Sequence, residues 1–252
     1  MRVPDAMSEC VAFLGVPKVD DTQEIVVSGT AFFVSVPSTL TPSRRYEYLV
    51  TAQHNLEKAG AREMFVRLNV WGKDAEDIPI GNAYSDDWVR HPTDGEPDAL
   101  RVDLAVRAWP ASEDRYNYQC LPVSMFLSDE VLAKQDEYGS WIGVGDEAVI
   151  IGLFTRVTGR RTNLPIVRIG NVAMMPTEPV PTGQGDQEVY LIEARSIGGL
   201  SGSPVFVRYS NEVGLSREFY FFGLMLGHWN APLGTIHDVA TDAAAAASGG
   251  GD

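Results

Sequence analysis

Hydrophobic residues in this chain occur in short runs rich in valine, isoleucine, phenylalanine and tyrosine, and glycine, proline and aspartate separate the runs. The runs are 24–27, 30–34, 47–50, 63–68, 104–106, 147–152, 166–169, 188–192, 204–207 and 218–224. Runs of this length between turn residues are typical of strands in an all-β sandwich or barrel. Helical periodicity is scarce, and residues 128–135 predict one short helix with Ser128 as its N-cap. The pattern therefore predicts an all-β fold.

Composition and charge limit the classes of partner. The 252 residues are 44% hydrophobic and 21% charged, which suffices for one large domain or two modest subdomains with cores of their own. The formal net charge of −14 argues against nucleic acid as a partner, because binding phosphates needs a basic surface. No basic start followed by an apolar stretch opens the chain, and no apolar run approaches the roughly 18 residues of a membrane span. We therefore expect a cytoplasmic protein that does not associate with membranes.

The chain has two cysteines, Cys10 and Cys120. Each lies in an apolar or mixed stretch, which favours two buried reduced thiols, with a disulfide or a reactive thiol as the alternative. Reduced thiols agree with a cytoplasmic setting.

Three separate stretches carry candidate chemistry. Residues 48–54 are an apolar strand that ends on His54, and residues 101–106 begin another strand just after Asp103. In the third stretch, 196–206, Ser201 lies on a glycine-rich turn, where glycine allows backbone N–H groups to turn toward a substrate carbonyl. A histidine, a buried carboxylate and a serine are the parts of a hydrolytic triad.

Other residues of the same types have weaker contexts. Asp94 and Asp98 lie in the polar loop before the second strand and fit turn caps. Ser203 is a rival nucleophile, but its neighbours lack the frame of glycines. His91 and His237 have no motif around them and fit surface positions.

The three stretches together resemble the trypsin/chymotrypsin-fold serine endopeptidases, in particular bacterial-type members. The resemblance rests on Thr51-Ala-Gln-His54, Asp103-Leu-Ala-Val106 and Gly199-Leu-Ser-Gly-Ser-Pro204, in that order, and spans roughly residues 10–230. It implies two antiparallel, six-stranded-type β-barrels with the active site in the cleft between them. We expect an N-terminal barrel over 8–115, a C-terminal barrel over 116–239 and a flexible alanine- and glycine-rich tail or linker over 240–252.

The resemblance also assigns roles. Ser201 would attack the scissile carbonyl, His54 would accept and return the proton, and Asp103 would orient the imidazole. The backbone N–H groups of Gly199 and Ser201 would form the oxyanion hole. No metal or organic cofactor is needed, and the substrate would be a protein or peptide.

Two features depart from the family. Leu200 occupies the position where secreted members carry an aspartate that pairs with a newly cleaved amino terminus, so we expect no activation of that kind. After Trp229 the chain lacks the usual further strand and closing helix. Either the second barrel closes unusually, or the chain is truncated, or another segment completes it.

Residues near the expected specificity pocket suggest what is cut. The pair His228-Trp229 resembles the glutamyl endopeptidases, in which a histidine holds an acidic side chain, and Arg195 lies where family members set the pocket's charge. Charge-assisted hydrogen bonds would then favour Glu or Asp before the cut. In the alternative, Arg195 points to solvent and His228 packs beside Trp229. The basic loop 156–161 either attracts acidic peptides or is simply solvated.

The sequence therefore predicts a serine endopeptidase. The alternative is a catalytically idle protease fold that binds peptides or acts as an interaction module. A third possibility is a protease domain of a larger assembly, with a partner or further domain linked through the tail.

Overall fold

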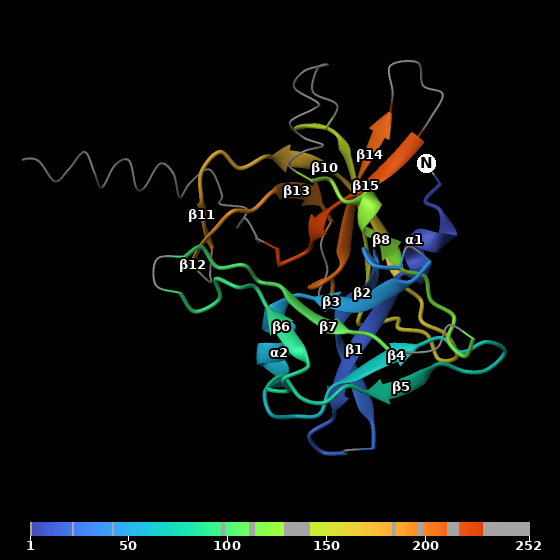
Figure 1. Ribbon diagram of the computed structural model, residues 1–252. Helices are drawn as coiled ribbons and strands as arrows, with labels where there is room; N and C mark the ends of the chain where they lie inside the picture. Colours follow the sequence, from blue (N-terminus) through green and yellow to red (C-terminus); the bar gives the residue numbers. More distant parts are fainter. Residues whose placement is uncertain are drawn as a thin grey trace, which may run out of the picture.

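The computed structural model describes residues 2–21, 23–41, 43–96, 99–110, 114–128, 142–182, 185–195, 199–210 and 217–228. Its regular structure is almost entirely antiparallel, and two main sheets lie one above the other (Figure 1). The all-β class predicted from the sequence is confirmed.

The first sheet has eight strands in the order β5-β4-β1-β2-β3-β7-β6, and β8 pairs in parallel with β2. Its strands are β1 (Val11–Pro17), β2 (Ile25–Pro37), β3 (Arg45–Thr51), β4 (Phe65–Leu68), β5 (Glu76–Pro79), β6 (Trp88–Arg90), β7 (Ala105–Ala108) and β8 (Leu121–Pro122). Three short helices accompany it: α1 (Asp5–Glu9), α2 (Gln53–Ala59) and the 3-10 helix η1 (Val123–Met125). In this order β5 and β6 are the first and the last strand of the ladder.

The second sheet has five strands in the order β13-β10-β9-β14-β15. They are β9 (Glu147–Gly152), β10 (Ile166–Met174), β13 (Leu191–Ala194), β14 (Pro204–Ser210) and β15 (Arg217–Leu224). A separate two-stranded hairpin, β11 (Val180–Thr182) with β12 (Gly185–Gln187), lies between β10 and β13 in the chain. The described residues thus form one ladder of eight strands and one of five.

Burial on both faces explains the unbroken apolar runs in β1 and β2. Successive side chains of a strand point to opposite faces. Leu14 and Phe33 enter a core inside the first sheet, while Phe13 and Phe32 enter a second core that they share with Phe206 of the other sheet. Strands buried on both faces have continuous rather than alternating hydrophobicity.

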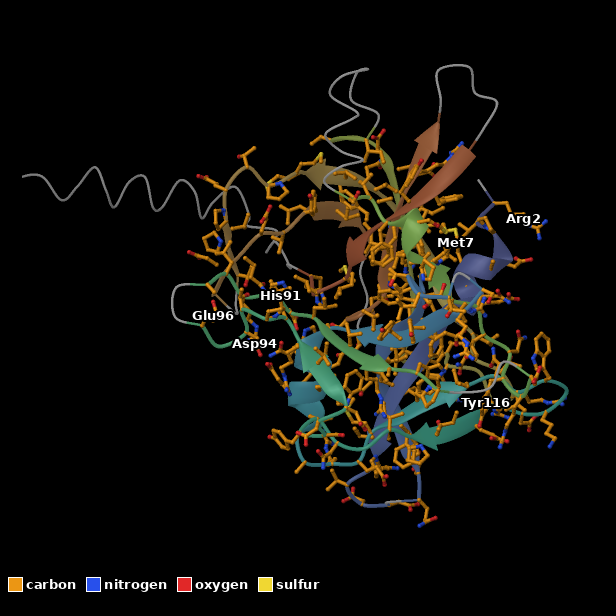
Figure 2. All side chains as sticks on the ribbon, viewed as in Figure 1. Arg2, Met7, His91, Asp94, Glu96 and Tyr116 are labelled. Carbon is orange, nitrogen blue, oxygen red and sulfur yellow. The ribbon has the colours of Figure 1, made fainter. Side chains whose placement is uncertain are left out.

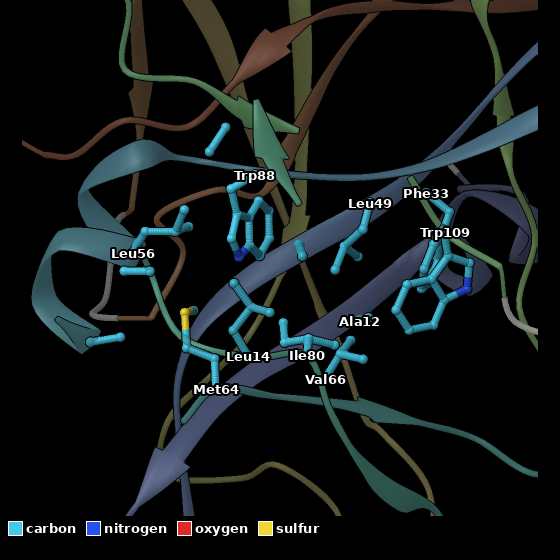
Figure 3. Close-up of a cluster of buried hydrophobic side chains, with 14 of the residues drawn as sticks. Ala12, Leu14, Phe33, Leu49, Leu56, Met64, Val66, Ile80, Trp88 and Trp109 are labelled. Atoms are coloured by element: carbon cyan, nitrogen blue, oxygen red, sulfur yellow. The ribbon is translucent and has the colours of Figure 1, made fainter. Parts of the chain in front are cut away.

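The core inside the first sheet fixes the position of α2 (Figure 3). Leu56 of the helix packs there with Met64 and Trp88, while Phe33 packs against Trp109 with ring centroids 5.3 Å apart. This packing matters for the site, because α2 carries the candidate histidine.

Some expected elements differ in detail. Apart from residue 24, the runs 24–27 and 30–34 belong to the single strand β2. Strand β3 ends at Thr51, so that His54 lies in α2 rather than at a strand end. The run 188–192 falls mostly between β12 and β13. The predicted helix 128–135 and the tail 240–252 lie outside the described residues, apart from Ser128. In the described part of the chain, no helix has the length and apolar character needed to cross a membrane.

Candidate active site

His54 lies in the buried first turn of helix α2, which directly follows β3. Only Ala52 separates the strand from α2, and an extended residue there starts the helix without a side-chain cap. Leu56 fixes the helix in the core below, which leaves His54 4% exposed. The ring therefore has little freedom to reorient.

Asp103 engages His54 with both carboxylate oxygens. His54 Nδ1 lies 2.5 Å from Asp103 Oδ2, and the backbone N–H of His54 donates to Oδ1 at 2.8 Å. Since an ionised carboxylate only accepts, the contact places the ring proton on Nδ1 and leaves Nε2 as a base. Burial alone would raise the pKa of the Asp103 carboxyl, but the hydrogen bonds from His54 and the nearby charges of His54 and Arg101 outweigh it. They hold the pKa below its ordinary value.

Ser201 lies on a tight turn just before β14. Gly199 and Gly202 have φ of +103° and +83°, a region that favours glycine over other residues. The turn is fastened to the segment after β15, because Gly202 N donates to the carbonyl of Met225 at 2.8 Å and Met225 N donates to that of Ser203 at 2.8 Å. The turn is therefore held by β14, which it precedes, and by the segment that follows β15.

Leu200, between the two candidate oxyanion-hole residues, is 2% exposed. It packs in an apolar cluster with Ile150 and Val205 of the second sheet. The turn is thus anchored by hydrophobic burial at Leu200.

The side chain of Ser201 is not hydrogen-bonded to the imidazole. Its Oγ donates to the carbonyl of Leu226 at 3.4 Å, longer than the usual 2.5–3.0 Å of an O–H···O bond. Between the described residues Ser201 and His54 there is no hydrogen bond, although Asn55 Nδ2, next to the histidine in α2, donates to the Ser201 carbonyl at 3.0 Å. The structure brings the serine turn against α2, with its hydroxyl turned toward Leu226.

Two backbone donors beside the hydroxyl are free. The N–H groups of Gly199 and Ser201 donate to no acceptor in the part of the chain that the structure describes. Free N–H groups on a fixed turn are the kind of donor that stabilises a developing oxyanion.

The candidate specificity residues are open to solvent. Arg195 and His228 are both exposed, and neither forms a hydrogen bond or an ion pair with any described residue. Arg195 directly follows β13, and His228 lies beyond the end of β15. Trp229, which the sequence pairs with His228, lies outside the described residues.

The rival candidates lie elsewhere. His91 and Asp94 are on the loop after β6 (Figure 2), where the ring Nδ1 of His91 is 2.8 Å from Thr93 Oγ1. Asp94 accepts from Gln53 Nε2 at 3.1 Å, and Ser203 is fully buried with its hydroxyl unpaired. Asp98 and His237 are outside the described residues. Among described side chains, no cluster of three histidines, cysteines or acidic residues is placed to hold a metal ion.

The basic loop is docked on the first sheet rather than standing free. Ala75 N donates to the carbonyl of Arg161 at 2.7 Å, and Arg161 Nε pairs with Asp74 at 2.8 Å. Asn163, 6% exposed, donates through Nδ2 to the carbonyl of Arg67 at 2.7 Å. The loop thus links the two sheets.

Three polar residues of the site were missed at the level of sequence: Thr30, Thr51 and Asn55. They link the serine turn to the first sheet through hydrogen bonds between residues as many as 169 positions apart. Their one local signal is a polar residue inside or directly after an apolar run.

Comparisons with known proteins give little. No family model matches the chain, and no curated protein does. Among solved structures, the chain is similar to the MamO protease domain from Magnetospirillum magneticum in its apo form, with 13% identity and a TM-score of 0.47. The similarity covers 85% of this chain and 92% of that one.

Proposed function

We propose that the protein is a serine endopeptidase that uses Ser201, His54 and Asp103. The observation that carries the proposal is the buried pair in which Asp103 binds both the ring and the backbone of His54. This arrangement fixes the ring's tautomer and leaves Nε2 as a base. The serine turn is bonded to the same helix through Asn55.

The chemistry proceeds in two halves. Ser201 Oγ forms a bond to the scissile carbonyl carbon while Nε2 of His54 takes its proton, and the ionised Asp103 stabilises the resulting imidazolium. The oxyanion is held by the N–H groups of Gly199 and Ser201. His54 then protonates the leaving amine, the C–N bond breaks, and water releases the acyl group by the same steps in reverse order.

The hydroxyl must first turn away from Leu226. Rotation about the Cα–Cβ bond of Ser201 changes the direction of Oγ without moving the backbone, since side chains interchange between staggered rotamers. The long contact to Leu226 offers little resistance, because hydrogen bonds weaken with distance.

A preference for Glu or Asp before the cut follows from charge. Arg195 and His228 are exposed and engage no described partner, so both are available to an incoming carboxylate. We further propose that the substrates are proteins or peptides met in the cytoplasm.

One observation favours a second function, a catalytically idle peptide-binding module. The hydroxyl of Ser201 is bonded to Leu226 rather than to His54. A turn kept in this state would present the free N–H groups of Gly199 and Ser201 to a bound peptide without attacking it.

Digestion of a peptide library that carries every residue before the cut separates the two functions. Native protein and Ser201→Ala are incubated in parallel, cleavage is followed by mass spectrometry, and binding is followed by calorimetry. We expect cleavage by the native protein alone, after Glu or Asp. Binding by both proteins with cleavage by neither would establish the idle module, and cleavage after Arg, Lys or Phe would reject the roles given to Arg195 and His228.

A further inference from the structure

We propose that Thr30 and Asn55 are positioning residues, which hold the carbonyls of Gly199 and Ser201 so that the N–H groups of the same two residues are preset for an oxyanion. The proposal rests on the proposed endopeptidase function and deepens it. Both residues belong to the first sheet's side of the molecule, and the turn they hold belongs to the second.

Thr30 contacts the second sheet's side from the middle of β2, where it is 0% exposed. Its backbone N–H donates to the carbonyl of Ser201 at 3.0 Å, and its Oγ1 donates to the carbonyl of Gly199 at 2.9 Å. The same Oγ1 accepts from Leu153 N at 3.0 Å. Because the hydroxyl has one hydrogen and Leu153 supplies its own, that hydrogen is directed to Gly199.

Asn55 holds the other end of the turn. Its Nδ2 has two hydrogens, and these are donated to the carbonyl of Ser201 at 3.0 Å and to Thr51 Oγ1 at 3.1 Å. Thr51 Oγ1 in turn donates to the carbonyl of Thr30 at 2.7 Å. The network is closed, and each of these buried polar groups has a partner, which is the condition under which such networks make a structure rigid.

The glycines show how closely the turn fits this network. A Cβ at Gly202 would lie 2.2 Å from the carbonyl oxygen of Thr30 and 2.5 Å from Thr51 Oγ1. A Cβ at Gly199 would lie 2.9 Å from Thr155 Cγ2. At Gly202 the turn therefore approaches the first sheet more closely than a side chain at that position would allow.

Fixed carbonyls have a consequence for catalysis. A peptide group is planar, so a carbonyl that is held fixes the orientation of its peptide unit and limits the rotation of the next. Oxyanion donors contribute most when they are oriented before the reaction begins. Removing the Thr30 hydroxyl frees the Gly199 carbonyl without touching the triad.

The test compares Thr30→Val, which keeps the shape and loses the hydroxyl, with Thr30→Ser, which keeps the hydroxyl. Kinetics are measured on the peptide that the library selects. Since losing a direct oxyanion donor costs about 10²–10³ in kcat, loss of a residue that orients one should lower kcat about 10- to 100-fold in Thr30→Val, with KM nearly unchanged. Thr30→Ser should retain most of the native kcat. A native kcat in Thr30→Val, or equal losses in both variants, would overturn the proposal.

Crystal structures of the two variants give a readout that does not depend on activity. We expect the peptide unit between Gly199 and Leu200 to be rotated in Thr30→Val and unchanged in Thr30→Ser. An unchanged peptide in Thr30→Val would also overturn the proposal. A native protein that cleaves nothing would reject the endopeptidase function, and the crystallographic comparison would still decide the role of Thr30.

Asn55→Leu provides a second variant in case Thr30→Val does not fold. It removes both hydrogen bonds that Asn55 Nδ2 donates. Asn55 is 8% exposed, compared with 0% for Thr30, so the substitution lies nearer the surface. We expect the same loss of kcat with KM preserved. A loss of thermal stability at native kcat would show that Asn55 serves the fold alone.

Discussion

The two sides of the candidate site are held in different ways. On the first sheet's side, the side chains of His54 and Asp103 are bonded directly to each other and buried. On the second sheet's side, Ser201 is held through its backbone carbonyl by Thr30 and Asn55, and its hydroxyl has one long contact. The proposed base is therefore oriented by side chains and the proposed nucleophile by the main chain, which leaves only the hydroxyl free to rotate.

Removing a member of the triad has the largest expected effect. In serine hydrolases, loss of the serine or the histidine costs on the order of 10⁶ in kcat. We expect losses of that size in Ser201→Ala and His54→Ala. Asp103→Asn should cost about 10⁴-fold, because the amide favours the wrong tautomer. His91→Ala is the matched control outside the site, and a comparable loss there would contradict the assignment of His54.

The packing of the serine turn against the first sheet is tested by adding a methyl group at Gly202, where the turn lies closest to Thr30. Gly202→Ala places a Cβ against the carbonyl of Thr30 at a φ of +83°, and we expect it to lower the free energy of unfolding by at least about 2 kcal/mol. Gly72→Ala is the control, since its φ is +68° but nothing lies within 4 Å of the added Cβ. It should cost about 1 kcal/mol from the backbone alone. Equal losses in denaturant titrations of the two variants would show that the turn is not closely packed against Thr30.

The contribution of the Asp103–His54 pair to the free energy of unfolding should depend on pH. The pKa of Asp103 is lowered in the folded state, so its ionised form stabilises the fold above the unfolded-state value of about 3.9. That contribution is lost as the pH falls through the folded-state pKa. The difference in unfolding free energy between the native protein and Asp103→Asn should therefore shrink as the pH falls below about 5. A difference that stayed constant down to the lowest pH at which both remain folded would contradict the ionised pair.

The smallest effect is expected at the neighbouring serine. The hydroxyl of Ser203 is fully buried without a partner, and an unpaired buried donor is itself a cost. Ser203→Ala should therefore change the free energy of unfolding by less than about 1 kcal/mol, in either direction. Thr51→Val removes a hydroxyl of similar burial that makes two hydrogen bonds, and it should destabilise the fold by about 1–2 kcal/mol. Thermal unfolding of Ser203→Ala and Thr51→Val measures the difference in stability between the two variants.

The sequence predicted the parts of the site whose signal is local. His54, Asp103 and Ser201 each lie in a short stretch with its own pattern of apolar and small residues, and the all-β class follows from the strand-length runs. Thr30 and Asn55 were missed because their partners are 169 and 146 residues away, and nothing near them in the chain marks those partners. The helix α2 was missed because its seven residues are too few to show a helical period.

The directions of side chains, such as the hydroxyl of Ser201, also could not be predicted from the sequence. The turn from Gly199 to Ser203 follows from glycine and proline, but nothing in the sequence shows that the Ser201 hydroxyl is directed to the carbonyl of Leu226. The basic loop 156–161 was expected either to attract acidic peptides or to be solvated. In the structure Arg161 Nε donates to Asp74, and the carbonyl of Arg160 accepts from Arg67 of β4, contacts that only tertiary packing brings about.

The central claim is that the hydroxyl of Ser201 is a nucleophile activated by His54. Its most direct measurement is the intact mass of the folded protein after reaction with a fluorophosphonate, followed by mapping of the modified residue. We expect one adduct, on Ser201, that is absent from Ser201→Ala and forms far more slowly in His54→Ala. A folded native protein that takes up no adduct, or takes it up at Ser203, would reject Ser201 as the nucleophile.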